Sequence, residues 1–355
     1  MSLTCYTESI WDKLSHTNKN IYIYGLGLGT EKILLECEKR NILIKNILIS
    51  DKQRKIKAEY QKYDIIKISK ALEDPNAIIL LGFGSQKRDV LDYFYYLDDN
   101  FEVYSPDVPV FGDGVFDMEF FKENEENFNR AYSLLADDIS KDTFKATIDY
   151  KISGKLCHLR NFTQHKDEIF KNVLKIHQNE HFVDLGAYTG DTIAEILHYG
   201  NFKTATAFEP DIKNYTKMLD FFKNNNISNV NALNIGVWEK EDILKFAGKS
   251  SRNSSLMQSS ENEISINVNS VDNIMQNREV TLIKMDVEGA ERQAITGAKN
   301  TISTYKPRLN ISAYHRNEDL FDIIFRLYDI CPEYKFYIRH HEYVPSWDTN
   351  LYATI

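Results

Sequence analysis

The sequence predicts an α/β protein built from two doubly wound, mainly parallel sheets. A buried strand runs into a glycine turn at residues 20–25, and the same pattern returns at residues 181–186. After each turn, apolar runs typical of strands alternate with stretches of helical periodicity, which favours a parallel sheet covered by helices. The chain has 355 residues. Since about 150 residues per domain is usual, its length suits two such units.

The first unit is expected over residues 1–115, as a small Rossmann-like domain. Its strands are predicted at residues 20–25, 44–50 and 77–82, with a helix after the first glycine turn. Its end is marked by four residues that break regular structure: Pro106, Pro109, Gly112 and Gly114. Residues 116–175 follow as a mainly helical bridge, which Gly154 divides into two stretches.

The second unit is expected over residues 176–355, with a seven-stranded sheet. Its strands are predicted at residues 181–186, 205–209, 230–235, 281–285, 307–313, 335–339 and 351–355. Helices are expected between the first five strands. The last two strands lie close together in the sequence, as an antiparallel pair at one sheet edge requires. Residues 250–263 are rich in Ser and Asn and are expected to form a flexible loop.

Composition excludes or disfavours several classes of protein. The net charge is −9, whereas a nucleic-acid reader more often carries a basic face, so a nucleic-acid partner is not expected. The four cysteines form no CxxC pair, which argues against a zinc site or a disulfide framework and suits a reducing cytoplasm. The sequence shows neither a leader-like start nor a stretch of about 18 apolar residues, so membrane insertion is not expected.

The strongest local motif is the second glycine turn, Val183-Asp184-Leu185-Gly186-Ala187-Tyr188-Thr189-Gly190-Asp191. A strand enters this turn and a helix leaves it, so backbone N–H groups can approach a ligand without an intervening Cβ atom. Glu209 ends the next strand about 20 residues further on, where an acidic residue can accept both ribose hydroxyls of a nucleoside. Neither a complete GxGxxG nor a GxxxxGK[ST] phosphate loop is present here. The glycine turn and Glu209 together therefore favour a nucleoside ligand without phosphates.

A second motif, Ile283-Lys284-Met285-Asp286-Val287-Glu288-Gly289-Ala290-Glu291, follows the strand at residues 281–285. Asp286 ends this strand and is expected at the carboxyl edge of the sheet, where open α/β sheets bind ligands. Glu288 and Glu291 have a simpler interpretation, because acidic residues in a first helical turn stabilise the helix dipole.

The third motif, Asn310-Ile311-Ser312-Ala313-Tyr314-His315, ends the neighbouring strand. An imidazole has an ordinary pKa near 6.5, so His315 beside Asp286 is a candidate general base. Arg339-His340-His341 closes the following strand. These three residues are interpreted either as a lining of the acceptor pocket or as a solvated basic turn.

Taken in order and spacing, these segments resemble the FkbM family of S-adenosylmethionine-dependent methyltransferases. The likeness covers about residues 155–355, through VDLGAYTGDT, AFEPDIKNY, TLIKMDVEGAERQAITGAKNTI, KPRLNISAYHRNEDLFDI and YKFYIRHH. It implies a class I methyltransferase fold with a seven-stranded sheet and S-adenosylmethionine as cofactor. It also implies methyl transfer, most often to a hydroxyl oxygen of a sugar, a glycan or a secondary metabolite.

The resemblance also assigns roles to individual residues. It implies that the cofactor is cradled by the first turn of this unit, held at its ribose by Glu209, and placed with its methyl group near Asp286. The predicted cofactor-binding residues are Asp184, Gly186, Ala187, Tyr188, Gly190, Asp191, Glu209, Pro210 and Asp286. The partner is then a small-molecule or glycan acceptor, and homo-oligomerisation is left open.

In-line transfer to a hydroxyl needs a base, because the oxygen must lose its proton as it attacks. The predicted catalytic residues are His315 as the base, Asp286 as the group that orients it or the acceptor, and Glu288. No metal site is predicted. An alternative has Asp286 and Glu288 holding a divalent ion that polarises the hydroxyl.

The first glycine turn, Gly25-Leu26-Gly27-Leu28-Gly29, leaves two other functions open. It departs from GxGxxG because Thr30 stands where the last glycine belongs, although Asp51 ends the next strand as a ribose-binding acid would. An NAD(P)-dependent oxidoreductase is one alternative. A non-catalytic protein that binds S-adenosylmethionine or a nucleotide sugar is the other. A degenerate unit used for packing, dimerisation or acceptor recognition is the preferred interpretation of this turn.

Overall fold

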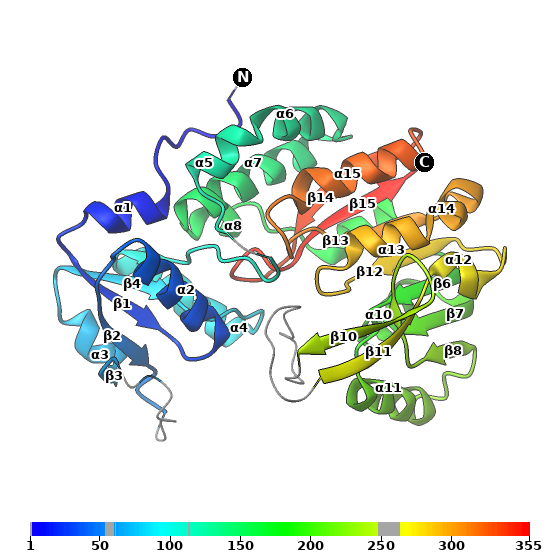
Figure 1. Ribbon diagram of the computed structural model, residues 1–355, viewed down its shortest axis with the longest axis horizontal. Coiled ribbons are helices and arrows are strands. Elements are labelled where there is room, and N and C mark those ends of the chain that lie inside the picture. The colour runs from blue at the N-terminus through cyan, green and yellow to red at the C-terminus, as the bar shows by residue number, and fades with distance from the viewer. Residues whose placement is uncertain (1, 54–59, 61, 113, 248–262) are drawn as a thin grey trace.

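The computed structural model describes residues 2–53, 60, 62–112, 114–247 and 263–355. Within these residues two large sheets flank a group of helices (Figure 1). This arrangement confirms the predicted α/β architecture, in which a smaller unit precedes a seven-stranded sheet.

The N-terminal sheet has parallel strands in the order β3-β2-β1-β4-β5. They are β1 (Asn20–Tyr24), β2 (Ile44–Ile49), β3 (Ile65–Lys67), β4 (Ala77–Leu81) and β5 (Val103–Tyr104). The helices of this unit are α1 (Ile10–His16), α2 (Leu28–Lys39), α3 (Ile68–Leu72) and α4 (Arg88–Asn100). The central strands are buried on both faces, which explains why they read as nearly continuous apolar runs.

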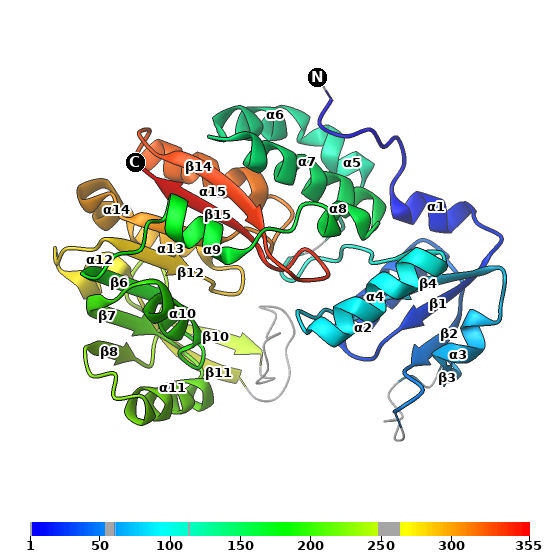
Figure 2. The same cartoon turned by 180° about the vertical axis from the view of Figure 1, so that it is seen from behind.

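Residues 116–175, the expected bridge, are mainly helical and lie between the two sheets (Figures 1 and 2). Its helices are α5 (Met118–Glu123), α6 (Glu125–Leu134), α7 (Asp138–Ser153), α8 (Cys157–Arg160) and α9 (Lys166–Glu168), followed by the π-helical turn η1 (Ile169–Val173). Gly154 ends α7 with a φ of +66°, a left-handed conformation that glycine adopts without steric cost.

The larger sheet contains all seven predicted strands. They are β6 (Glu180–Leu185), β7 (Phe202–Phe208), β8 (Val230–Leu233), β12 (Leu282–Met285), β13 (Arg308–Ser312), β14 (Lys335–His340) and β15 (Thr349–Thr354). Their order is β14-β15-β13-β12-β6-β7-β8. β15 is antiparallel to both β13 and β14, which confirms the predicted antiparallel pair at one edge.

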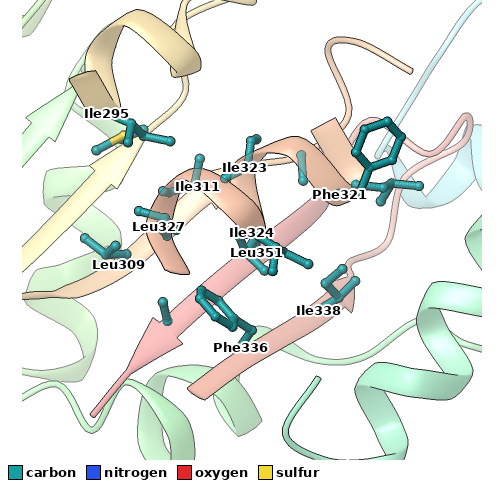
Figure 3. Close-up of a cluster of buried hydrophobic side chains, with 14 of the residues drawn as sticks. Ile295, Leu309, Ile311, Phe321, Ile323, Ile324, Leu327, Phe336, Ile338 and Leu351 are labelled. Atoms are coloured by element: carbon teal, nitrogen blue, oxygen red, sulfur yellow. The ribbon is translucent and has the colours of Figure 1, made fainter. Parts of the chain in front are cut away.

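Helices cover both faces of this sheet (Figures 1 and 2). They are α10 (Asp191–Tyr199), α11 (Ile212–Asn224), α12 (Val271–Met275), α13 (Glu291–Gly297), α14 (Lys299–Tyr305) and α15 (Asp319–Ile330). Figure 3 shows Ile324 and Leu327 of α15 beside the apolar side chains of β13, β14 and β15. Apolar side chains of the central strands are buried on both faces of the sheet, so these strands show little alternation of polar and apolar residues.

The connection from β8 to β12 differs from the expectation of a helix alone. It contains a small sheet of β9 (Gly236–Val237), β10 (Asp242–Ala247) and β11 (Glu263–Asn269), and then the short α12. β10 and β11 pair antiparallel, so their backbone groups form hydrogen bonds with each other and not with a strand of the large sheet. The flexible loop expected at residues 250–263 lies outside the described residues, apart from Glu263, which begins β11.

The interpretation of Arg339, His340 and His341 as a solvated turn is wrong, because all three are buried. The Arg339 guanidinium contacts Asp137 at 2.7 Å and Glu168 at 3.2 Å, both on the bridge. His341 pairs with the backbone carbonyl of Gln164, also on the bridge. These residues therefore fasten the helical bridge to the edge of the large sheet.

A buried ion pair joins the end of the N-terminal unit to the bridge. Lys151 of α7 lies 2.7 Å from Asp107, and each side chain is 2% exposed. Asp107 also accepts from Ser346, in the loop between β14 and β15, at 3.5 Å. Three parts of the chain thus meet at one carboxylate.

No helix of the described part has the length and apolarity needed to cross a bilayer.

Replacement of Lys151 tests how much the ion pair between Lys151 and Asp107 contributes to the stability of the fold. Lys151→Met leaves Asp107 buried without its charge partner, so we expect a loss of about 3 kcal/mol or more in the free energy of unfolding. Urea denaturation followed by circular dichroism measures it. The matched control is Lys171→Met, which breaks the exposed pair with Asp167 and should change stability by less than about 0.5 kcal/mol. Equal urea midpoints for both variants would contradict a stabilising role of the ion pair between Lys151 and Asp107.

Candidate functional site

The second glycine turn leaves β6 in a conformation that the sequence favours. Gly186 and Gly190 have φ values of +80° and +88°, and Gly190 caps α10 just before Asp191. A Cβ atom on Gly186 would collide with the backbone carbonyl of Asp286, so only glycine fits there. Tyr188 has a φ of +49° although it is not glycine. Such a strained conformation persists where the surrounding structure demands it.

Glu209 follows β7 and supports this turn from the side. Its carboxylate accepts the N–H of Tyr188 at 2.8 Å through Oε2 and the N–H of Asp211 at 2.9 Å through Oε1. Each oxygen has a second lone pair, which suits a pair of ribose hydroxyls. Burial raises the pKa of Glu209 to about 7, although the N–H donors of Asp211 and Tyr188 oppose this shift. Pro210 comes next and directs the chain to the start of α11.

Asp184 lies beneath the turn, fully buried near the end of β6. Neither of its carboxylate oxygens makes a hydrogen bond of good geometry within the described residues. Lys284 of β12 lies 3.5 Å from Oδ1 and donates to the carbonyl of Gly186 at 2.9 Å. Burial raises the pKa of Asp184 to about 6, against the opposing charge of Lys284. The site therefore holds a carboxylate that has acceptor capacity for a cationic or N–H-bearing ligand.

The turn after β12 lies directly beside the first turn. The N–H of Asp286 donates to the carbonyl of Leu185 at 3.0 Å, so the two turns share one ladder of backbone bonds. Glu288 and Gly289 have φ values of +52° and +92°. Glu288 is thus in a left-handed turn and not in a first helical turn, because α13 begins only at Glu291. The dipole interpretation of Glu288 is therefore wrong.

His315 lies behind Asp286 and is surrounded by carboxylates. Its Nε2 is 3.4 Å from Asp286 and 3.6 Å from Glu288, and its Nδ1 is 2.9 Å from Glu291. The ring is fully buried. Burial lowers the pKa of His315, but the carboxylates of Glu291, Asp286 and Glu288 outweigh it and raise the pKa to about 10. The structure thus brings together the three predicted catalytic residues.

Glu291 is the member of this cluster that sequence reasoning missed. It opens α13, where an acidic residue is common for the helix dipole alone, and that position hid its second role. In the structure Glu291 is 1% exposed. Its Oε1 accepts the N–H of Val287 at 3.0 Å and faces His315. Its place in the IKMDVEGAE segment, five residues after Asp286, was the one available signal.

The end of the N-terminal unit reaches this cluster through Phe111. The N–H of Phe111 donates to the carbonyl of His315 at 2.9 Å. The ring packs against Gly289 and lies 4.1 Å from the guanidinium of Arg316. Lys32 of α2 holds the same segment through the carbonyls of Pro109 and Val110. The smaller unit therefore supports the turn that carries Glu288.

The first glycine turn is engaged by groups of the protein itself. The N–H of Gly27 donates to the hydroxyl of Tyr60 at 2.6 Å, and the ring of Phe83 packs beside Gly25. Asp51 accepts the hydroxyl of Ser69 at 2.8 Å. Gly29 packs against the backbone of Gly82. All of these contacts lie within the N-terminal unit itself.

Comparison with known proteins agrees with the resemblance seen in the sequence. Residues 184–343 match the model of the methyltransferase FkbM domain. The methyltransferase FkbM from Methylobacillus flagellatus KT has a similar structure, with a TM-score of 0.70 and 22% sequence identity over 95% of this chain and 90% of that one. At this identity the likeness shows the fold, and it extends through the N-terminal unit and the bridge.

Other solved structures match about half of the chain. The precorrin-6y C5,15-methyltransferase from Geobacter metallireducens has 11% identity and a TM-score of 0.33, covering 51% of this chain and 81% of its own. An rRNA methylase from Streptococcus thermophilus has 12% identity and a TM-score of 0.34, covering 51% and 89%. These likenesses are too weak to carry an argument. No curated protein matches the sequence.

The two turns and the acidic cluster fall within the matched segment, and the Asp184, Glu209, Asp286 and His315 positions come together at one edge of the sheet. Residues 184–343 are therefore similar to the methyltransferase FkbM domain in sequence, and the site lies within this segment.

Proposed function

We propose that this protein transfers a methyl group from S-adenosylmethionine to a hydroxyl oxygen of a sugar, a glycan or a secondary metabolite. The observation that carries the proposal is the junction of two sites at one sheet edge. The turn with Asp184 and Glu209 suits a nucleoside donor, and Asp286 and His315 stand directly beside it. The match to the FkbM methyltransferase family supports the same reaction.

Backbone groups and carboxylates on the donor side support S-adenosylmethionine as the ligand. The backbone of Gly186, Ala187 and Tyr188 provides the close approach, with Gly190 and Asp191 at the start of α10. Glu209 and Pro210 would hold the ribose, and the carboxylate of Asp184 would receive the α-ammonium of the methionine part. The bound cofactor supplies an already activated methyl group, so the chain mainly has to position two reactants.

The acceptor side must take up one proton as the hydroxyl oxygen attacks. His315 is the proposed base, and Asp286 and Glu288 hold the imidazole and the acceptor. With a pKa of about 10, His315 carries its own proton at neutral pH in the ligand-free protein. His315 loses that proton more readily once a positive charge lies beside Asp286. It therefore acts as a base only in the site that holds the cationic donor.

A transfer assay tests the reaction. Labelled S-adenosylmethionine is incubated with sugar nucleotides, glycans and phenolic metabolites, and release of S-adenosylhomocysteine is followed. We expect Asp286→Asn and His315→Ala to lower kcat by about 10²-fold or more, since both act on proton transfer. The control is Asp220→Asn, on the exposed side of α11, which should keep full turnover. Near-normal turnover of His315→Ala would show that the base is another group.

The raised pKa of Glu209 leads to a second prediction, which concerns the pH dependence of cofactor affinity. The carboxylate form accepts the ribose hydroxyls, and it is the minor form below a pKa of about 7. S-Adenosylhomocysteine should therefore bind about fourfold more weakly at pH 6.5 than at pH 8, because the competent fraction of Glu209 falls by that factor. Calorimetric titration of wild type and Glu209→Gln measures this difference. A pH dependence of equal size in both proteins would assign it to another group.

A further inference from the structure

The cluster around His315 contains more negative charge than the imidazole can balance. Asp286, Glu288 and Glu291 all lie within 3.6 Å of its ring nitrogens. Two of these groups, Glu291 and His315, are at most 1% exposed. Carboxylates that converge in a buried place are costly unless a cation lies between them.

Two buried side chains of the cluster also have polar atoms without a hydrogen bond within the described residues. Neither ring nitrogen of His315 makes a hydrogen bond of good geometry, although all three carboxylates are close. The second carboxylate oxygen of Glu291, Oε2, is likewise buried without one. Both side chains lie next to Asp286, whose side chain is 34% exposed. Buried polar groups in this state are typical of a ligand-binding site.

The spacing of the donor atoms suits one metal ion. One donor atom each from Asp286, Glu291 and His315 lies within 4.8 Å of the others. Neighbouring ligands of an ion with bonds of about 2.1 Å are about 3.0 to 3.4 Å apart, so each pair of donor atoms has to approach by less than about 2 Å, shared between the two side chains, to complete the site. Two of the ligands are already oriented: Tyr314 donates to Asp286 at 3.3 Å, and the N–H of Val287 donates to Glu291. Such outer contacts commonly fix metal ligands in place.

We propose that Asp286, Glu291 and His315 bind one divalent cation beside the methyl-transfer site. Two carboxylates and one imidazole suit Mn²⁺, Fe²⁺ or Zn²⁺ and leave positions open for water and for an acceptor oxygen. This differs from the ion between Asp286 and Glu288 considered from the sequence, because the buried Glu291 takes the place of the exposed Glu288.

The inference rests on the proposed function for its chemical role. An acceptor hydroxyl bound to the ion would have its negative charge stabilised as the O–H bond breaks and the new O–C bond forms. With the ion bound, His315 would hold it through one ring nitrogen, so that the role of base proposed for His315 in the metal-free site would pass to a neighbouring carboxylate. Glu288, 3.6 Å from Nε2 of His315, is the neighbouring carboxylate that takes the proton, while the methyl–sulfur bond breaks to leave neutral S-adenosylhomocysteine.

Manganese binding tests the site without any acceptor. The full chain is treated with EDTA, freed of it, and titrated with Mn²⁺ by electron paramagnetic resonance. We expect one Mn²⁺ per chain in wild type, and affinity about 100-fold lower in Glu291→Gln and Asp286→Asn. The matched control is Glu318→Gln, which removes a nearby carboxylate that pairs with Arg292 and should leave Mn²⁺ affinity unchanged. Competition by Zn²⁺ and Mg²⁺ ranks the ions, and circular dichroism confirms that each variant is folded.

Equal Mn²⁺ affinity in wild type and folded Glu291→Gln would overturn the inference, as would absence of binding by Mn²⁺ and Zn²⁺ in wild type. Titration of S-adenosylhomocysteine in EDTA separates this failure from that of the proposed function. Binding of S-adenosylhomocysteine without any metal binding leaves the methyltransferase proposal in place and removes only the cation. Loss of S-adenosylhomocysteine binding in wild type would instead remove the donor site itself.

Discussion

The close backbone approach between Gly186 and Asp286 is the constraint on which the site depends. β6 and β12 pair in parallel register up to Leu185 and Met285, and the next N–H, of Asp286, bonds back to Leu185. Any side chain at residue 186 would push the two turns apart. Because they stay together, the turn proposed to hold the donor and the acidic cluster around His315 occupy one edge of the sheet. The chemistry proposed above needs this short separation, since in-line transfer depends on placing two reactants in contact.

Charge is distributed unevenly across this edge. Beside the first of these turns, Lys284 lies 3.5 Å from Asp184, and its positive charge opposes the rise that burial causes in the pKa of Asp184. In the cluster around His315, three carboxylates surround one imidazole. The excess of negative charge there favours binding of a proton or a cation. Phe111 and Arg316 cover the turn next to this cluster. The N-terminal unit therefore contributes to the architecture of the site, while its own glycine turn is contacted by Tyr60 and Phe83.

The large sheet was predictable from the sequence because its central strands are buried on both faces. Stretches such as the one from Leu282 to Met285 are mostly apolar, and each glycine or acidic residue that follows a strand marks its carboxyl end. The small sheet was missed because β9 has only two residues and β10 finds its partner β11 across a long connection. Local periodicity carries little information about such a pairing.

The site was predictable to the extent that its residues end strands: Asp286 and His315 follow adjacent strands, so their proximity was expected and is found. Glu291 was not singled out, because an acid at a helix start has an ordinary explanation that the sequence alone cannot separate from a contact with His315.

The central claim is that the turns at the ends of β6 and β12 bind the adenosyl donor together, and that the first glycine turn does not. Hydrogen–deuterium exchange with S-adenosylhomocysteine and, separately, with NADH tests it most directly. The account predicts that S-adenosylhomocysteine slows exchange at residues 186–191, 209–211 and 286–291, while residues 25–29 are unchanged by either ligand. Protection of residues 25–29 by NADH, with no effect of S-adenosylhomocysteine on the other three segments, would contradict it and favour an oxidoreductase.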